Sequence, residues 1–184
     1  MSTALIIVDI QNDYFPNGKM ALRNPDKAAA NASKVLAWFR QNNKDTIFHV
    51  QHIASNPELG FFLPNTDGAE IHETVLPIEH ENIIVKNFPN SFMKTKLERK
   101  LREKDVTKVV VVGMMTHMCI DATVRAAVDL GFETTLIEDA CATRDLSYQN
   151  KMVPAEQVHY AFVSALDSMY ANVISTEDFL NKSL

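Results

Sequence analysis

The sequence is poor in glycine, in basic clusters and in long apolar runs, and each shortage excludes a class of protein. Only five glycines occur among 184 residues, and the nucleotide-binding signatures GxGxxG and GxxxxGK[ST] are both absent. No apolar run approaches the roughly 20 residues that span a bilayer, so we expect no membrane partner. The net charge is −5 and no basic stripe is present, so we expect no nucleic-acid partner.

Cysteine is also scarce, and its scarcity bears on the redox environment. Cys119 and Cys141 are the two cysteines, and they stand in dissimilar contexts. The first ten residues lack the basic region of a signal peptide and run into an apolar stretch. We therefore expect a cytoplasmic protein with reduced thiols, in which Cys141 is structural. The length suits a single domain over residues 1–184 with a sizeable core.

Apolar runs alternate with helical patterns along the chain. Strands are predicted near residues 4–10, 46–52, 82–85, 109–112, 133–137 and 172–175, with a helix after most of them. This order predicts an α/β protein with three α/β/α layers on a mainly parallel, six-stranded sheet. The irregular segment 53–81 is too long for a simple connection, and such loops are usually functional lids or ordered excursions.

Residue types predict several local features as well. Ser91 is expected to cap a helix that runs to Lys104. The charged residues of this helix are expected to face solvent. Thr116 is expected to cap the next helix, and residues 138–150 read as a polar loop. A helix that begins near Pro154 is expected to bury one face, made of Val158, Ala161, Phe162, Ala165, Leu166 and Met169.

The stretch 109–131 reads as a buried strand, a sharp turn and a helix. This pattern places Cys119 in the first helical turn, just beyond the carboxyl end of a strand, where open α/β sheets bind ligands. The positive end of a helix dipole lowers the pKa of a thiol and favours the nucleophilic thiolate. A small buried hydrophobic residue is an equally good interpretation of the position alone.

Asp9 and Lys86 also stand at the ends of predicted strands. Each has a structural alternative, because the acid can cap a helix or pair with a surface cation and the lysine can be a solvated terminus. If the two face each other across the strand ends, both charges are satisfied. A cysteine nucleophile needs a group that takes its proton and one that stabilises its anion, which makes Asp9, Lys86 and Cys119 a candidate catalytic set.

Three motifs carry a family resemblance that runs nearly end to end. VDIQNDYF (8–15), VKNFPNSF (85–92) and VVVVGMMTHMCIDATVRAAVDLGF (109–132) resemble, in order and spacing, motifs of the isochorismatase-like cysteine hydrolases, which include nicotinamidases and N-carbamoylsarcosine amidases. The resemblance implies a Rossmann-like hydrolase fold. It also implies acyl transfer, in which Cys119 attacks a carbonyl carbon, Asp9 moves the proton, Lys86 supports the ionic forms and water hydrolyses a thioester.

The resemblance implies further features of the site and of the assembly. A cis peptide is implied between Met114 and Met115, and the amides of Met115 and Cys119 are implied to form an oxyanion hole. The implied partners are a small-molecule substrate and further copies of the chain, in a homodimer or homotetramer. The candidate substrate-binding residues are Phe15, Phe61, Phe62 and His117.

The departures from the family pattern concern metal binding. Nicotinamidases carry an Asp-x-His metal pair after the second strand, plus a later histidine. Here the stretch HVQHIASNP places His52 near the aspartate position and Ala54 near the first histidine position. His72 and His80 lack the required spacing. We therefore predict no catalytic metal and no cofactor, and the pattern argues against nicotinamidase activity.

Three interpretations of the function remain open. The leading one is a cysteine hydrolase that cleaves a C–N bond of a small amide, ureide or carbamoyl compound. The second is isochorismatase-type vinyl-ether hydrolysis, which in this family does not use a cysteine nucleophile, so Cys119 argues against it. The third is a non-catalytic binding protein on the same fold.

Overall fold

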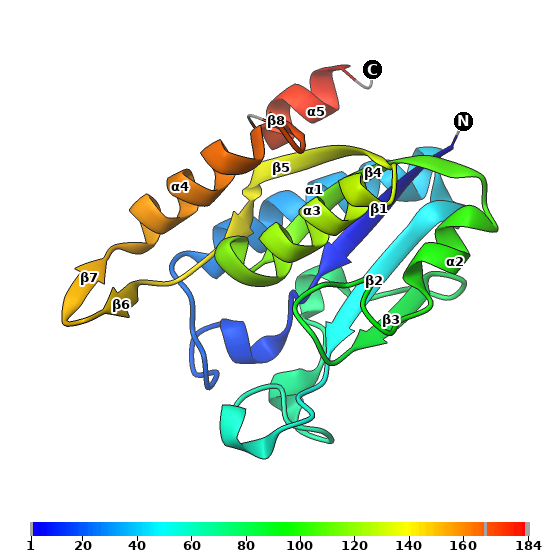
Figure 1. Cartoon of the computed structure of the whole chain (residues 1–184). Helices are drawn as coiled ribbons and strands as arrows, with labels where there is room; N and C mark the ends of the chain where they lie inside the picture. Colours follow the sequence, from blue (N-terminus) through cyan, green and yellow to red (C-terminus); the bar gives the residue numbers. More distant parts are fainter. Residues whose placement is uncertain (1, 168, 183–184) are drawn as a thin grey trace.

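A six-stranded, all-parallel sheet forms the centre of the molecule (Figure 1). The computed structural model describes residues 2–167 and 169–182. The sheet order is β3-β2-β1-β4-β5-β8, with β1 at Ser2–Val8, β2 at Ile47–His52, β3 at Asn82–Lys86, β4 at Val106–Met114, β5 at Glu133–Ala142 and β8 at Asn172–Ile174. The helices are α1 (Pro25–Asn42), α2 (Leu97–Arg102), α3 (Asp121–Asp129), α4 (Ala155–Asp167) and α5 (Thr176–Lys182).

The two faces of the sheet build two hydrophobic cores. Along β1, Leu5 and Ile7 pack on one side with α1 and α5, whereas Ala4 and Ile6 pack on the other side with α2, α3 and α4. This alternation is the period of two that strand geometry imposes. Because both faces are covered, the central strand β1 is apolar and buried from Ala4 to Val8, as in other parallel sheets. The predicted three-layer α/β/α fold is confirmed.

Gly113 is required where β4 pairs with the last residue of β1, Val8. Its φ angle is +131°, and a Cβ atom at this position would lie 2.0 Å from the carbonyl oxygen of Val8. No side chain fits so close to a backbone oxygen, and the φ angle itself disfavours any residue with a Cβ. Glycine therefore lets the two central strands run side by side up to the carboxyl edge of the sheet.

Two predicted helix caps are wrong, and in both cases the hydroxyl has a tertiary partner instead. The Ser91 hydroxyl is fully buried, 2.8 Å from the hydroxyl of Thr123, and α2 begins only at Leu97. Thr116 lies inside a π-helical turn, and its hydroxyl contacts His159 Nδ1 at 3.0 Å. Each hydroxyl contacts a residue of another element, and the N-cap positions are occupied by Lys96 for α2 and by Met115 for the π-helical turn.

The segment 138–150 is not the predicted polar loop. β5 continues to Ala142, and its pairing with β4 resumes at Cys141 after an irregularity that accommodates the polar residues 138 and 139. A two-stranded hairpin follows, formed by β6 (Leu146–Tyr148) and β7 (Lys151–Val153). Figure 1 shows that this hairpin projects away from the sheet.

The predicted core face of α4 is only partly correct. Val158 and Leu166 are buried, but Ala161 and Ala165 are exposed, and Met169 lies beyond the end of the helix with 81 % of its surface exposed. The helix packs on α3, on β8 and on the π-helical turn. A helix at the edge of a layer has neighbours on one narrow side, so a wide apolar stripe is covered only in part.

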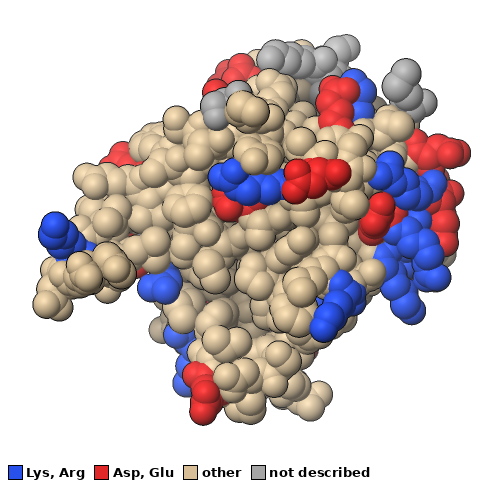
Figure 2. Space-filling model, viewed as in Figure 1, with Lys and Arg blue, Asp and Glu red and all other residues tan. Residues whose placement is uncertain are grey.

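Charged residues around α2 form the predicted solvated face. Figure 2 shows blue and red side chains interleaved over this region. Arg99 pairs with Glu103 at 3.5 Å, and Arg102 pairs with Glu98 at 3.6 Å, with all four side chains largely exposed. Such pairs give little net stability and leave no unbalanced basic patch.

Within residues 2–167 and 169–182, no helix is both long enough and apolar enough to cross a membrane.

Candidate active site

Three ionisable side chains from three different elements meet at the carboxyl edge of the sheet. Lys86 Nζ, at the end of β3, lies 2.6 Å from Asp9 Oδ2 and 3.2 Å from Cys119 Sγ. Asp9 directly follows β1, and Cys119 lies in the turn between β4 and α3. All three side chains are buried, with at most 4 % of any residue exposed. The structure thus brings together the three residues that the sequence singled out.

Asp9 is held in an unusual conformation with one carboxylate oxygen free. Its φ angle is +50°, in the left-handed region, and its amide donates to the carbonyl of Val50. A non-glycine residue in this region is strained, and such residues concentrate at functional sites. Oδ2 accepts from Lys86, whereas Oδ1 is buried without a hydrogen-bond partner among the described residues. The free oxygen is an acceptor available for a proton.

The ammonium group of Lys86 is stabilised in its charged form. Burial alone lowers the pKa of a lysine, but the charge of Asp9 and the nearby Cys119 outweigh it, so the pKa of Lys86 is raised above its usual value. When a cation and a carboxylate are buried side by side, each compensates the charge of the other. Lys86 therefore remains protonated throughout the physiological pH range.

Cys119 does not have the lowered pKa that its position in the sequence suggests. It lies in the π-helical turn Thr116–Ile120 that precedes α3. Burial raises the pKa of the Cys119 thiol, Asp9 raises it further, and Lys86 opposes both without reversing them. In the resting site the sulfur thus keeps its proton, and thiolate formation requires transfer of that proton to a neighbouring acceptor.

His52 is a member of this cluster that the sequence did not assign to it. Its Nδ1 lies 2.9 Å from Lys86 Nζ and 4.0 Å from Asp9 Oδ2. Gln11 holds the backbone of His52 from both sides, because its Nε2 donates to the His52 carbonyl and its Oε1 accepts from the His52 amide. The signal in the sequence was the position of His52 at the end of a strand, as for Asp9 and Lys86.

The turn that carries Cys119 is anchored to α4. The peptide bond between Met114 and Met115 is cis, at the position that the resemblance implied. Directly after it, the hydroxyl of Thr116 contacts His159 Nδ1 at 3.0 Å, and His159 Nε2 lies 3.5 Å from Glu138 Oε2. These contacts tie the turn to α4 and to β5.

Aromatic side chains from the loop 53–81 pack beside the cluster. The ring centroid of Phe62 lies 4.6 Å from that of Tyr14 and 5.9 Å from that of His52. Phe61 lies 6.1 Å from Tyr14. The pKa of Tyr14 is raised by burial and by the nearby Cys119 and Asp9, so its phenol stays protonated. Tyr14 is thus an aromatic neighbour of the cluster that the sequence analysis did not select.

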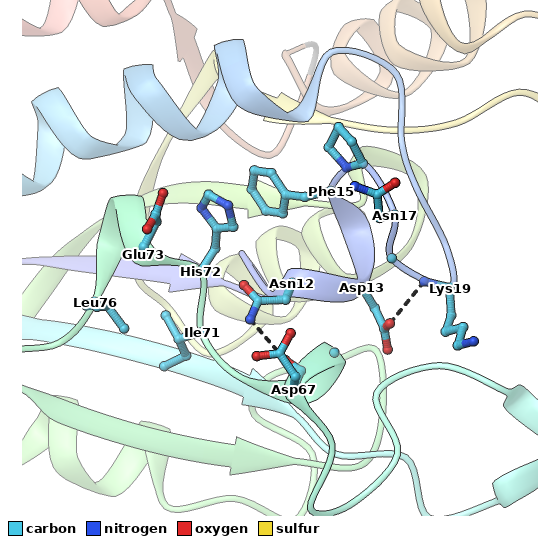
Figure 3. A pocket seen from close by; sticks show the side chains of 13 residues that line it. Asn12, Asp13, Phe15, Asn17, Lys19, Asp67, Ile71, His72, Glu73 and Leu76 are labelled. Carbon is cyan, nitrogen blue, oxygen red and sulfur yellow. Dashed lines mark hydrogen bonds between the residues drawn. The ribbon is translucent and has the colours of Figure 1, made fainter.

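Phe15 faces a different cavity from the one expected. Its ring stacks on His72 with centroids 3.5 Å apart, and both residues line a cavity of about 550 Å³ beside the turn Asn12–Tyr14 (Figure 3). Asp9, Lys86 and Cys119 are not among the residues that line it. The neighbouring side chain along the chain, Tyr14, points toward the cluster instead.

His117 lies in the same π-helical turn as Cys119 and faces the end of β5. Its Nδ1 contacts the hydroxyl of Thr143 at 2.6 Å. Burial and the charge of Arg144 lower the pKa of His117, so its ring is neutral at pH 7. The Arg144 Nε atom is buried without a hydrogen-bond partner among the described residues. Thr143 also lines a second cavity, of about 700 Å³, next to the start of α4.

The donor atoms of the cluster do not suit a metal ion, although their spacing permits one. Among the described residues, Asp9, His52 and Cys119 place one ligand atom each within 4.8 Å of the others. The Lys86 ammonium group, however, lies within 3.2 Å of all three donor atoms. A divalent cation at this position would meet a fixed positive charge, which is strongly unfavourable in a buried site.

The chain is similar to known proteins along nearly its whole length. The family model described as the Isochorismatase domain matches residues 3–178. The isochorismatase family protein YddQ of Bacillus subtilis is 59 % identical over 98 % of this chain and 99 % of its own length. A crystal structure of an isochorismatase from Pseudomonas putida has a TM-score of 0.89 and is 34 % identical, covering 96 % of this chain and 89 % of its own. The nicotinamidase of Escherichia coli is 26 % identical over 75 % of this chain and 82 % of its own length.

Proposed function

Because this chain belongs to the isochorismatase family of hydrolases, we propose that it cleaves the C–N bond of a small amide, ureide or carbamoyl compound through a cysteine nucleophile. The observation that supports this proposal is the buried contact of Lys86 with both Asp9 and Cys119, at 2.6 and 3.2 Å. A relative named as a nicotinamidase shows that amide hydrolysis occurs on this scaffold.

The first half of the proposed reaction forms a thioester. The sulfur of Cys119 attacks the carbonyl carbon of the substrate, and the thiol proton moves to the free Oδ1 of Asp9. The developing oxyanion accepts hydrogen bonds from the amides of Met115 and Cys119. Asp9 then delivers its proton to the nitrogen as the C–N bond breaks, so that ammonia or an amine leaves as a neutral molecule.

The second half returns the enzyme to its starting state. A water molecule gives a proton to Asp9 and attacks the thioester carbon, and the C–S bond breaks. The proton returns to the sulfur, and the product leaves as a carboxylic acid or a carbamic acid. Lys86 keeps its proton in every step, and its charge compensates whichever of Asp9 and Cys119 is negative.

The raised pKa of the Cys119 thiol fits this division of roles. A resting thiolate beside the Asp9 carboxylate would put two negative charges in one buried site. With a neutral thiol, the site holds one carboxylate and one ammonium group, which balance each other. Asp9 therefore takes the thiol proton only when a substrate carbonyl carbon is present for the sulfur of Cys119 to attack.

The test is ammonia release from a panel of small amides, ureides and carbamoyl compounds. We expect release by the wild-type protein and a loss of at least about a thousandfold in Cys119→Ala. Cys141→Ala is the matched control, because Cys141 is also buried but lies outside the cluster, and it is expected to keep activity. Pyruvate release from isochorismate that survives Cys119→Ala would contradict the proposal and favour vinyl-ether hydrolysis.

A further inference from the structure

The ammonium group of Lys86 has three N–H bonds, and the structure provides three acceptors for them. Asp9 Oδ2, His52 Nδ1 and Cys119 Sγ lie at 2.6, 2.9 and 3.2 Å from Nζ. A lysine on a flexible side chain can rotate its donors freely unless every one of them is engaged. Two acceptors leave one donor unsatisfied in a buried site, so the third acceptor, His52, completes the set.

The backbone of His52 is held by Gln11, and its ring packs against Phe62. Gln11, with no exposed surface, bonds both the amide and the carbonyl of His52, and it also donates to the carbonyl of Ala69 at 2.7 Å. Phe62, fully buried, lies against the ring with centroids 5.9 Å apart. The side chain of His52 is 13 % exposed. A restrained ring is an acceptor of fixed direction.

The charges around His52 favour its neutral form. The groups that face it are Lys86 on β3, Asp9 after β1 and Cys119 in the π-helical turn. Burial and the charge of Lys86 lower the pKa of His52, and Asp9 opposes them. A neutral ring that accepts at Nδ1 carries its proton on Nε2.

We infer that His52 is a positioning residue of the proposed hydrolase, which accepts the third hydrogen bond of Lys86 and thereby keeps the ammonium group directed at Cys119. The inference rests on the proposed function for its catalytic meaning but not for the contact itself. His52 acts through Lys86 and takes no part in bond making. Without it, Lys86 turns away from the sulfur for part of the time, and the thiolate loses its nearest positive charge.

The first arm of the test examines the contact in the wild-type protein. Nitrogen-15 NMR of the histidine rings identifies the tautomer of each. We expect His52 to carry its proton on Nε2 at pH 7, with Nδ1 showing the shift of a hydrogen-bond acceptor. A proton on Nδ1 would overturn the inference, because Nδ1 and Lys86 would then both be donors.

The second arm measures how His52 affects Cys119, with iodoacetamide as the probe. His52→Leu keeps the volume but removes the acceptor, whereas His52→Asn keeps an acceptor at the place of Nδ1. We expect alkylation of Cys119 to slow by about tenfold to a hundredfold in His52→Leu and to recover to within about threefold of wild type in His52→Asn. Peptide mass spectrometry separates Cys119 from Cys141, whose thiol pKa burial raises to about 12.

The matched control is His72→Leu, since His72 stacks on Phe15 at a different cavity. It is expected to leave the alkylation rate unchanged. Equal rates in His52→Leu and wild type, or equally slow rates in the leucine and asparagine variants, overturn the inference. Neither arm uses an amide substrate, so a failure of the proposed function and a failure of this inference give different results.

Discussion

Lys86 and Asp9 form an ion pair of 2.6 Å between two side chains that have no exposed surface. The pair joins the ends of β3 and β1, which are separated by β2 in the sheet. A buried pair of this kind is costly to assemble, and removing one partner leaves an uncompensated charge in the interior. The stability of the chain and the chemistry of the site therefore depend on the same contact.

We expect Lys86→Met to destabilise the protein by about 3–5 kcal/mol, because Asp9 is then buried without its counterion. The measurement is urea denaturation followed by circular dichroism. Lys108→Met is the matched control. Lys108 pairs with Glu133 at 2.9 Å, but both side chains are about half exposed or more, so its loss is expected to cost at most about 1 kcal/mol. Equal losses in the two variants would contradict this account.

Asp9→Asn is expected to separate thiol reactivity from turnover. Asp9 raises the pKa of the Cys119 thiol and Lys86 lowers it. Removing the carboxylate charge therefore lowers the thiol pKa, and alkylation by iodoacetamide at pH 7 becomes faster than in wild type. Ammonia release falls by at least about a hundredfold, because the proton acceptor is lost. Slower alkylation in Asp9→Asn would show that Asp9 activates the thiol at rest.

Stability is expected to fall as the pH falls below 7, and His49 is one cause. Burial and Arg40 lower the pKa of His49 from 6.5, so the unfolded chain takes up a proton at His49 before the folded protein does. Stability then decreases with falling pH, by up to about 1.4 kcal/mol per pH unit for one proton. In His49→Gln this part of the slope between pH 7 and 5.5 is expected to disappear, as measured by denaturation at each pH.

Glu81, the partner of His49, extends the same trend to lower pH. Burial raises the pKa of Glu81, but hydrogen bonds from Arg40, Ile78 and His49 outweigh it and lower the pKa below 4.5. The stability that Glu81 contributes is present above the carboxyl range of the unfolded chain and is lost as the pH falls through its folded pKa. If the slope of stability against pH between pH 7 and 5.5 is the same in His49→Gln as in wild type, groups other than His49 cause it.

Gly113→Ala is expected to prevent folding or to cost more than about 3 kcal/mol, since its Cβ would lie 2.0 Å from the Val8 oxygen. Gly60→Ala is the matched control. Gly60 also has a positive φ angle, +73°, but nothing lies within 4 Å of its added Cβ, so only about 1 kcal/mol of backbone strain is expected. Thermal unfolding of both variants measures the difference.

Strong periodic signals allowed most of the fold to be predicted from the sequence. The apolar runs indicated the strands of the sheet, because a strand covered on both faces is rich in apolar residues, but the polar residues 138 and 139 concealed the continuation of β5 to Ala142. Ser91 and Thr116 were misassigned because a hydroxyl in a capping position looks the same whether it bonds its own helix or a distant residue such as Thr123 or His159. Sequence position carries no information on that choice.

The candidate site shows the same limit. Asp9, Lys86 and Cys119 were identified because each is a polar residue at the end of an apolar run. His52 stands at a strand end too, but a histidine has several ordinary structural roles. Only the 2.9 Å contact with Lys86 identifies His52 as a member of the cluster. Tyr14 and Phe15 are adjacent in sequence, and the backbone turn alone decides which ring faces the cluster.

The location of the Lys86 ammonium group among three donor atoms has a consequence for how the site is assembled. Its positive charge is synthesised with the polypeptide and reaches its place when β3 folds into the sheet. A charge delivered in this way needs no loading step after folding. It does not dissociate on dilution, a chelator does not remove it, and a competing ion does not replace it.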